Sequence, residues 1–336
     1  MIQANTSHGH LMATELEQSS AVFTAAATQN VPADVRRLIT ADTQAIYTIA
    51  RGSSDAAANV LSYEFMRELG IPVTSLPPSV FSVGHGVGVK HAAGLIISQS
   101  GGSDDLVRAT QGLGTSGAKT IAITNVAGSA VEKQADLTLP IGAGPEQAVP
   151  ATKTVIGSIA AGLALLAALK PDYAMRLTQA ARDFERVGHL PVDQHTALRA
   201  ALLRARNVYI IGRDTGFGAA QEVALKIKET CAIHAESYSA SEVLHGPLQL
   251  ATNALTVLVL DTGAPHTRNS IDTAIDRFRS VGAEVFHITP QVTGLPPAPA
   301  AAALLRHVYP VILDVALALG HNPDSPATLS KVTVTR

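Results

Sequence analysis

The stretch Ala45–Leu61, AIYTIARGSSDAAANVL, decides the fold, because an apolar run passes through a Gly/Ser turn into an alanine-rich helix pattern. The run Ala45–Ala50 predicts a buried strand, and Ile71–Leu76 predicts another strand beyond the helix. A strand, a crossover helix and a second strand make a βαβ unit, in which the two strands are parallel. The stretch therefore predicts an α/β domain built on a parallel sheet.

The same alternation of strand and helix patterns continues to about residue 170. Apolar strand patterns recur at residues 93–98, 119–124 and 135–140, with helical patterns between them and an Ala/Gly-rich helix after the last. These strands, with the first two, predict a doubly wound, mainly parallel five-stranded sheet flanked by helices. In such a sheet the carboxyl ends of neighbouring strands face one crevice, where small ligands bind.

A second copy of this domain begins near Asn207, where NVYIIG is followed by a turn and a helical pattern. Several residues of the first copy recur in the second at one constant offset. They are Tyr47, Ile49, Arg51, Ala57 and Ala58, which correspond to Tyr209, Ile211, Arg213, Ala219 and Ala220. We infer an internal duplication and expect a five-stranded sheet in each half.

The duplication divides the 336 residues into segments of ordinary size for α/β domains. In the second half, strand patterns begin at residues 207, 255 and 283, and helices are expected at about 217–232 and 271–281. We expect a helical segment at 1–30, a first domain at 31–170, a helical connector at 171–204, a second domain at 205–320 and a C-terminal tail at 321–336.

The composition is that of a soluble globular protein, with 46% hydrophobic and 15% charged residues and a formal charge of −2. This charge supplies no basic field, so we expect no nucleic-acid partner. The single cysteine, Cys231, excludes an intramolecular disulfide, and the N-terminus lacks a signal-peptide pattern. The longest apolar stretch, Val155–Leu169, is too short to span a bilayer. We expect a cytoplasmic protein without a membrane segment.

The stretch Ala224–Pro247, ALKIKETCAIHAESYSASEVLHGP, predicts an active site on one helix and the turn after it. Lys226, Lys228 and Glu229 stand in an Ala/Leu/Ile pattern typical of a buried helix, where ionisable groups need partners or a task. His245 follows in a Leu-His-Gly-Pro turn, where a plain turn histidine is the alternative interpretation. A carboxylate and an imidazole together suit proton transfer on a small polar substrate near neutral pH.

A loop rich in hydroxyl groups follows the strand at residues 93–98. Hydroxyls, backbone N–H groups and the positive end of a helix dipole meet there in one anion-sized space, which favours a phosphate. A second such turn follows the first strand, and both turns lie on the same predicted crevice. The alternative is ordinary helix capping and a strand-end hydroxyl. The candidate phosphate ligands are Ser53, Ser54, Ser98, Gln99, Ser100 and Ser103.

Cofactor and metal sites are not indicated. The loop at Ser98–Ser103 has no GK[ST] ending, and no acidic residue follows at dinucleotide-fold spacing, so a nucleotide cofactor is not expected. The histidines lack the paired spacing of metal ligands. Lys331 is ambiguous by itself: it is either solvated or, between Leu329 and Val332, desolvated enough to form a Schiff base with a sugar carbonyl.

Taken together, these segments resemble the sugar isomerase (SIS) family, and most closely the isomerase half of the glutamine:fructose-6-phosphate amidotransferases. The resemblance covers nearly the whole chain and rests on motifs in a specific order. They are GSS at Gly52, SQSG at Ser98, ITNVAGS at Ile123, E-x-x-V-x-A-T-K at Glu146, ALKIKE at Ala224, HAESYSASEVLHGP at His234 and LSK at Leu329. Among stand-alone chains, the sequence is most similar to the SIS-fold glucosamine-6-phosphate deaminases.

The resemblance implies a role for each candidate. Glu229 would move a proton between C1 and C2 of the sugar, and Lys226 would orient it and stabilise charge on the intermediate. His245 would open the pyranose ring, and Lys331 would engage the carbonyl end. The serines and Gln99 would hold the phosphate, with the Val149 backbone lining the site. The implied reaction converts glucosamine-6-phosphate and water to fructose-6-phosphate and ammonia, without a cofactor or metal.

The resemblance also implies a homodimer, in which His245 completes the neighbouring subunit's site. Because Cys231 lies inside a predicted helix and the chain starts Met1-Ile2, no glutaminase activity is expected. The chain departs from the family pattern at Gly102-Ser103, where a hydroxyl for the phosphate is kept, and at Pro150-Ala151. The second departure removes a hydroxyl that would contact the sugar, and it leaves the amino sugar open. The alternatives are a deaminase, deglycase or isomerase for another phosphosugar, such as galactosamine-6-phosphate or fructosamine-6-phosphate, and a non-catalytic sugar-phosphate sensor.

Overall fold

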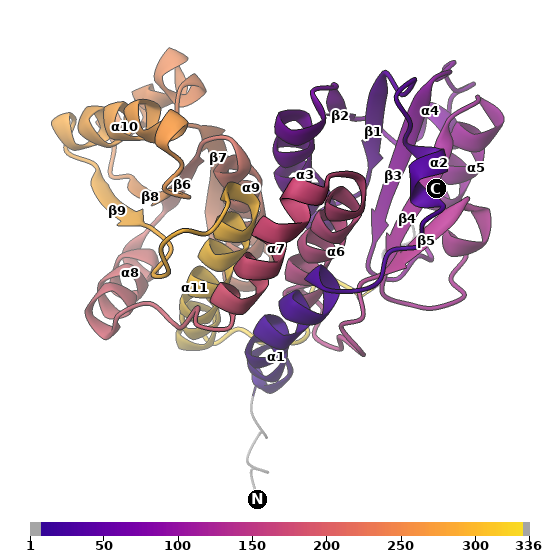
Figure 1. Ribbon diagram of the computed structural model, residues 1–336. Helices are drawn as coiled ribbons and strands as arrows, with labels where there is room; N and C mark the ends of the chain where they lie inside the picture. Colours follow the sequence, from indigo (N-terminus) through magenta and orange to yellow (C-terminus); the bar gives the residue numbers. More distant parts are fainter. Residues whose placement is uncertain (1–7, 332–336) are drawn as a thin grey trace, which may run out of the picture.

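The computed structural model describes residues 8–331 and contains two parallel sheets flanked by helices. Figure 1 shows the sheets on opposite sides of a helical layer that includes α3, α6, α7, α9 and α11. The first sheet has the order β2-β1-β3-β4-β5, and β3 is buried along its whole length. Its strands are β1 (Ala45–Ile49), β2 (Val73–Ser75), β3 (Ala92–Ser98), β4 (Lys119–Thr124) and β5 (Leu137–Pro140).

The second sheet is also parallel but has four strands, in the order β7-β6-β8-β9. The expected fifth strand is wrong, and the described chain turns to a helix after the fourth. Pro290, Pro296 and Pro297 follow β9 closely, and proline cannot donate to a sheet ladder. The strands are β6 (Asn207–Gly212), β7 (His234–Ser239), β8 (Thr256–Leu260) and β9 (Glu284–Ile288).

Strand β7 corrects the interpretation of Ala224–Pro247 as one helix and a turn. The helix ends at Cys231, because Ala232 adopts the left-handed conformation with φ +53° and reverses the chain. His234–Ser239 then pairs with β6 in a parallel register from Asn207↔His234 to Gly212↔Ser239. The segment therefore leaves α9 as an edge strand before it reaches the turn that carries His245.

The helices pack around and between the sheets. The first half contains α1 (His10–Ala27), α2 (Val35–Leu38), α3 (Ser53–Leu69), α4 (Ser79–Ser82), α5 (Asp104–Thr115), η1 (Glu132–Gln134) and α6 (Lys153–Leu169). The second contains α9 (Thr215–Cys231), η2 (Glu242–His245), η3 (Pro247–Thr252), η4 (Pro265–Thr267), α10 (Arg268–Ser280) and α11 (Pro297–Ala318). Between the halves lie α7 (Pro171–Phe184) and α8 (Val192–Arg204).

Helices α3 and α9, one from each half, approach closely at Gly218. A Cβ at Gly218 would lie 2.7 Å from the Val60 nitrogen and 2.9 Å from the Ala56 carbonyl oxygen, so only glycine allows the two backbones to meet. One hydrophobic core runs through both domains and includes residues of α3, α6, α9 and α11. This contact brings a helix of the second half to the carboxyl ends of the first sheet.

Helix α11 is long and apolar enough to cross a membrane by length and composition, with a mean hydropathy of 1.5 in its most apolar window. That window is 78% buried in the protein, where Val308, Tyr309 and Ile312 are fully enclosed. It therefore has the character of a core helix.

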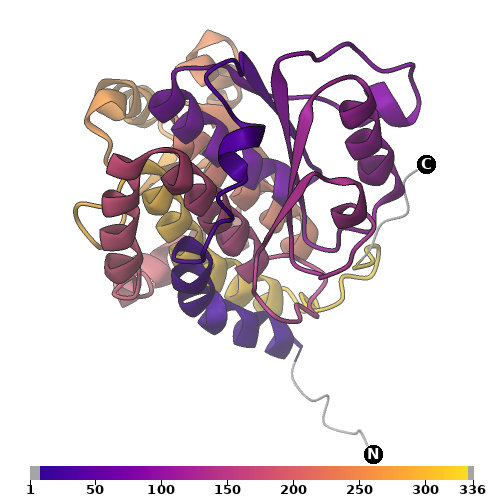
Figure 2. The same ribbon diagram turned by 45° about the vertical axis from the view of Figure 1, so that its right-hand side comes forward.

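After α11 the chain returns to the first domain, as Figure 2 shows. Asp324 fixes this segment, because its carboxylate accepts from the N–H groups of Leu11 (3.1 Å) and Met12 (2.8 Å) at the start of α1. Its carbonyl accepts from the Val149 N–H at 2.9 Å. These bonds lead Lys331 back to the first sheet. Residues 332–336 of the expected C-terminal tail lie outside the described residues.

Candidate active site

A cavity of about 520 Å³ lies where the turns after β1 and β3 face α9. It brings together the sequence-predicted site residues from both halves, with the exception of His245. Their roles stay predictions, but their convergence from five separate segments is a feature of the structure. The lining consists of Arg51, Gly52, Ser53, Ser54, Ile97, Ser98, Gln99, Ser100, Ser103, Leu106, Val149, Ala151, Lys226, Glu229, Leu329, Ser330 and Lys331.

The loop after β3 is shaped by Gly101, which has φ +59°. A Cβ there would lie 2.2 Å from the Ser129 hydroxyl, so glycine is required both for its conformation and for its space. The Ser98 hydroxyl accepts from the Gly101 N–H at 3.0 Å, which holds the loop closed at its base. Ser103 stands at the N-cap of α5 but makes no side-chain capping bond. Its hydroxyl is therefore not committed to the ordinary capping role.

A buried lysine with two carboxylate partners stands on α9. Lys226 is 1% exposed, and its Nζ donates to Glu229 Oε2 and lies 3.6 Å from Glu222 Oε1. Burial alone would lower the pKa of Lys226, but the two carboxylates hold it above its ordinary value. Lys228, which was expected on the same buried face, is exposed instead. It stands two residues after Lys226, and a helix turns by about 100° per residue, so the two lysines lie on nearly opposite faces.

Glu222 is a member of this group that the sequence analysis missed. Its side chain is fully buried, and the Tyr309 hydroxyl of α11 donates to Oε1 at 3.0 Å. Burial raises the pKa of Glu222 to about 7, although the ammonium of Lys226 opposes the rise. The i, i+4 spacing from Glu222 to Lys226 was the available signal, since it places both side chains on one helix face.

Lys331 reaches the cavity from the C-terminal segment. Its Nζ donates to the Ala148 carbonyl at 2.7 Å and to Glu146 Oε2 at 3.2 Å. Glu146 is buried and also accepts from Thr152 and Thr154 at the start of α6, which ties the lysine to a rigid element. The neighbouring Val149 lines the cavity, but its N–H is taken by the Asp324 carbonyl.

His245 ends η2 and is exposed, and it does not line the cavity. Within one chain, the structure therefore leaves the predicted acid–base site without this imidazole. Arg51, in contrast, lines the cavity although only its place in the duplicated turn was noted from the sequence. It donates from Nε and Nη2 to Asp105 Oδ2, at 2.9 and 2.7 Å.

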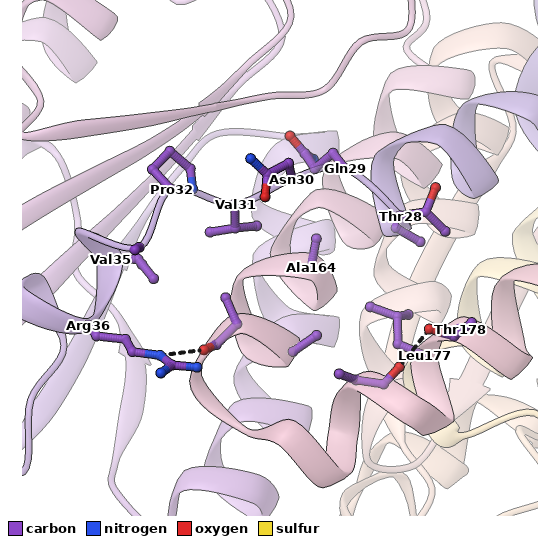
Figure 3. Close-up of a pocket in the computed structure, with 15 residues that line it drawn as sticks. Thr28, Gln29, Asn30, Val31, Pro32, Val35, Arg36, Ala164, Leu177 and Thr178 are labelled. Carbon is purple, nitrogen blue, oxygen red and sulfur yellow. Dashed lines mark hydrogen bonds between the residues drawn. The ribbon is translucent and has the colours of Figure 1, made fainter.

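A second hollow, of about 610 Å³, lies between the end of α1, α2, α6 and α7 (Figure 3). Of its lining residues, Arg36 is the charged one, and its Nε is turned to the Ala168 carbonyl at 3.0 Å. The hollow has no carboxylate–amine pair among these residues. Within residues 8–331, no three His, Cys, Asp or Glu side chains gather as a metal site. The cavity at α9 is therefore the candidate active site.

The comparisons with known proteins agree with the two-domain fold. The SIS domain family matches residues 39–168 and 201–294. A glutamine--fructose-6-phosphate aminotransferase [isomerizing] of Methanothermobacter thermautotrophicus is 32% identical over 87% of this chain and 52% of its own length. The corresponding protein of Aeropyrum pernix is 33% identical over 85% of this chain and 50% of its own length. The chain spans about half the length of these curated relatives.

Solved structures give the same result. A protein of Silicibacter pomeroyi, described as a phosphosugar isomerase, is 32% identical with a TM-score of 0.81, over 93% of this chain and 99% of that one. The glucosamine-6-phosphate deaminase of Thermotoga maritima shares the fold at 20% identity, with a TM-score of 0.71 over 97% of this chain and 100% of that one. The resemblance seen in the motifs is confirmed, and the chain belongs to the SIS domain family.

Proposed function

We propose that this protein is a phosphosugar isomerase that acts as a deaminase, converting glucosamine-6-phosphate and water to fructose-6-phosphate and ammonia. The observation that carries the proposal is the Lys226–Glu229 pair, which shares one cavity with the hydroxyl-rich loop Ser98–Ser103. A carboxylate held by a buried ammonium suits proton transfer, and the loop suits a phosphate. The relatives named as sugar-phosphate enzymes support the substrate class.

In the proposed reaction, the open-chain amino sugar loses its C2 proton to the Glu229 carboxylate. The electron pair of the C–H bond forms the C1–C2 double bond, and the C1 oxygen takes up negative charge. Lys226 lies against Glu229 and stabilises this charge, while Lys331 donates to the carbonyl end. Glu229 then returns the proton to C1 while the nitrogen lone pair forms the C2=N bond. A proton passes from the nitrogen to the C1 oxygen, which leaves a hydroxyl at C1 and an imine at C2.

Water adds to the C2 imine carbon, and cleavage of the C–N bond releases ammonia and leaves the ketose. The balance is one water consumed for each ammonia released, with no change in oxidation state overall. Ring opening before these steps requires an acid and base at the ring oxygen and O1. We assign this step to His245 of a second subunit in a homodimer, because His245 is exposed and lies outside the cavity of its own chain.

The proton transfer is tested by running the reaction in D₂O and following the fructose-6-phosphate by NMR. The proposal predicts deuterium at C1 of the product, because a glutamate exchanges its proton with solvent during turnover. A direct hydrolysis of the amine would release ammonia without isomerisation and give no C1 label. That result would contradict the role of Glu229.

A further inference from the structure

Arg51 is the arginine among the residues that line the cavity. Among the lining residues, Lys226 is paired with Glu222 and Glu229, and Lys331 is paired with Glu146. Arg51 instead begins the Gly52–Ser54 turn, and its partner Asp105 stands on the first turn of α5, immediately after the Ser98–Ser103 loop. Among the residues that line the cavity, Arg51 is therefore the only guanidinium beside the two serine turns.

The anchoring of Arg51 leaves donors for a ligand. Both of its contacts fall on a single oxygen, Asp105 Oδ2, while Oδ1 accepts from the Leu106 N–H at 2.9 Å. The Asp105 side chain is only 3% exposed, so the guanidinium is held against a buried carboxylate. The Arg51 side chain itself is 53% exposed. Nη1 and the outer N–H of Nη2 have no acceptor within the described chain.

The charge of a phosphate monoester explains why such a group is needed. The ester carries about 1.5 to 2 negative charges at neutral pH, whereas serine hydroxyls and backbone N–H groups are neutral donors. A guanidinium matches the geometry of phosphate oxygens and binds them with charge-assisted hydrogen bonds. The exposed position of Arg51 also lets it meet the phosphate as the substrate enters.

We propose that Arg51 contacts the substrate's phosphate and selects the phosphorylated sugar, with Asp105 as the residue that positions it. This inference rests on the proposed function for the identity of the ligand. The competing role is structural, since the ion pair also ties the turn after β1 to α5. If the pair were only structural, removing either partner would change phosphate affinity to the same extent. If Arg51 recognises the phosphate, the loss of Arg51 has the larger effect.

Calorimetric titration with inorganic phosphate, glucosamine-6-phosphate and unphosphorylated glucosamine tests the proposal on the whole chain. We expect Arg51→Gln to weaken binding of the two phosphate ligands by roughly 10- to 100-fold, the effect of a charge-assisted hydrogen bond, and to leave glucosamine unchanged. The matched control is Arg108→Gln, which breaks the exposed Arg108–Asp104 pair on α5, the helix that also carries Asp105. We expect it to have no effect on binding.

Asp105→Asn separates recognition from structure. It keeps the guanidinium and removes its partner's charge. The loss of phosphate affinity in Asp105→Asn is therefore expected to be smaller than the loss in Arg51→Gln by a factor of about five or more. Equal losses in both variants, or unchanged phosphate affinity in a folded Arg51→Gln protein, would overturn the proposal. Binding of inorganic phosphate needs no turnover. A loss confined to Arg51→Gln in a protein inactive on all amino sugars would therefore uphold Arg51 while the proposed reaction fails.

Discussion

Arg67 on α3 occupies the position that Glu229 occupies on α9, and its Nη2 donates to Asp214 Oδ1 at 2.5 Å. The two helices begin at corresponding residues, after Gly52 with φ +52° and ψ −126° and after Asp214 with φ +57° and ψ −135°. In the second half, however, the Asp214 carboxylate occupies the start of the helix and also bonds Thr215 N and His266. The turn of the second half is thus occupied by the Arg67–Asp214 ion pair, whereas the corresponding turn of the first half, at Gly52, faces the cavity.

This ion pair is expected to contribute strongly to stability. Arg67 also donates to the buried Glu64, so Arg67→Leu leaves that carboxylate without its cation and should destabilise the fold by about 3 kcal/mol. Urea unfolding measures the change. Arg37→Leu is the control, since it breaks an exposed pair with Asp34 and should cost less than about 0.5 kcal/mol. Equal unfolding midpoints for the two variants would contradict this account.

The first sheet and its serine loops could be predicted from the sequence, because β1, β3 and β4 are long apolar runs followed by turn residues. Strand β7 could not, because HAESYS lacks an apolar run and its place depends on pairing with β6. The four-stranded second sheet was missed because the duplication implied equal halves. Prolines after β9 were the available signal against a fifth strand.

Most residues that line the candidate site could be predicted from the sequence, but the hydrogen bonds and ion pairs that position them could not. Ser98, Lys226 and Glu229 stand in motifs, so their residue types indicated the chemistry. Glu222 and the ion pair of Arg51 escaped notice because burial and partners across the fold give them their properties. Sequence spacing shows which residues share a helix face, but the partner that Tyr309 provides from α11 depends on tertiary packing.

Glu229→Gln should lower kcat by about 10²- to 10⁴-fold, because the amide keeps the shape of the carboxylate but cannot accept a proton. The dissociation constant for glucosamine-6-phosphate should stay within about threefold of the wild-type value. Steady-state kinetics and calorimetry measure the two effects. Glu236→Gln, on β7 and outside the cavity lining, is the control. A matching loss of affinity in Glu229→Gln would argue against its role as the base.

The buried Glu222 should make stability depend on pH. Its pKa is raised from 4.5 to about 7 in the folded protein, so between these values the folded state holds a proton that the unfolded state has released. Stability should therefore fall as pH rises through this window, by on the order of 3 kcal/mol. Glu222→Gln should remove most of that slope in unfolding measured from about pH 5 to about pH 8. An unchanged slope would mean that Glu222 does not titrate there.

The shared site of the proposed homodimer can be tested by mixing two inactive variants. Glu229→Gln and His245→Ala damage the same site from different subunits if His245 acts across the interface. After exchange of subunits, a mixed dimer should hold one intact site, and activity should return to about a quarter of the wild-type value by random pairing. No recovery, with subunit exchange verified by mass spectrometry, would place His245 outside its neighbour's site.

The most direct test of the proposed function is the release of ammonia from glucosamine-6-phosphate, with galactosamine-6-phosphate and fructosamine-6-phosphate assayed alongside. The account predicts one ammonia and one fructose-6-phosphate for each glucosamine-6-phosphate consumed, and loss of both products in Glu229→Gln. Release from only one of the other sugars would keep the reaction and change the substrate. Binding of all three without ammonia or isomerisation would contradict the central claim and favour a sugar-phosphate sensor.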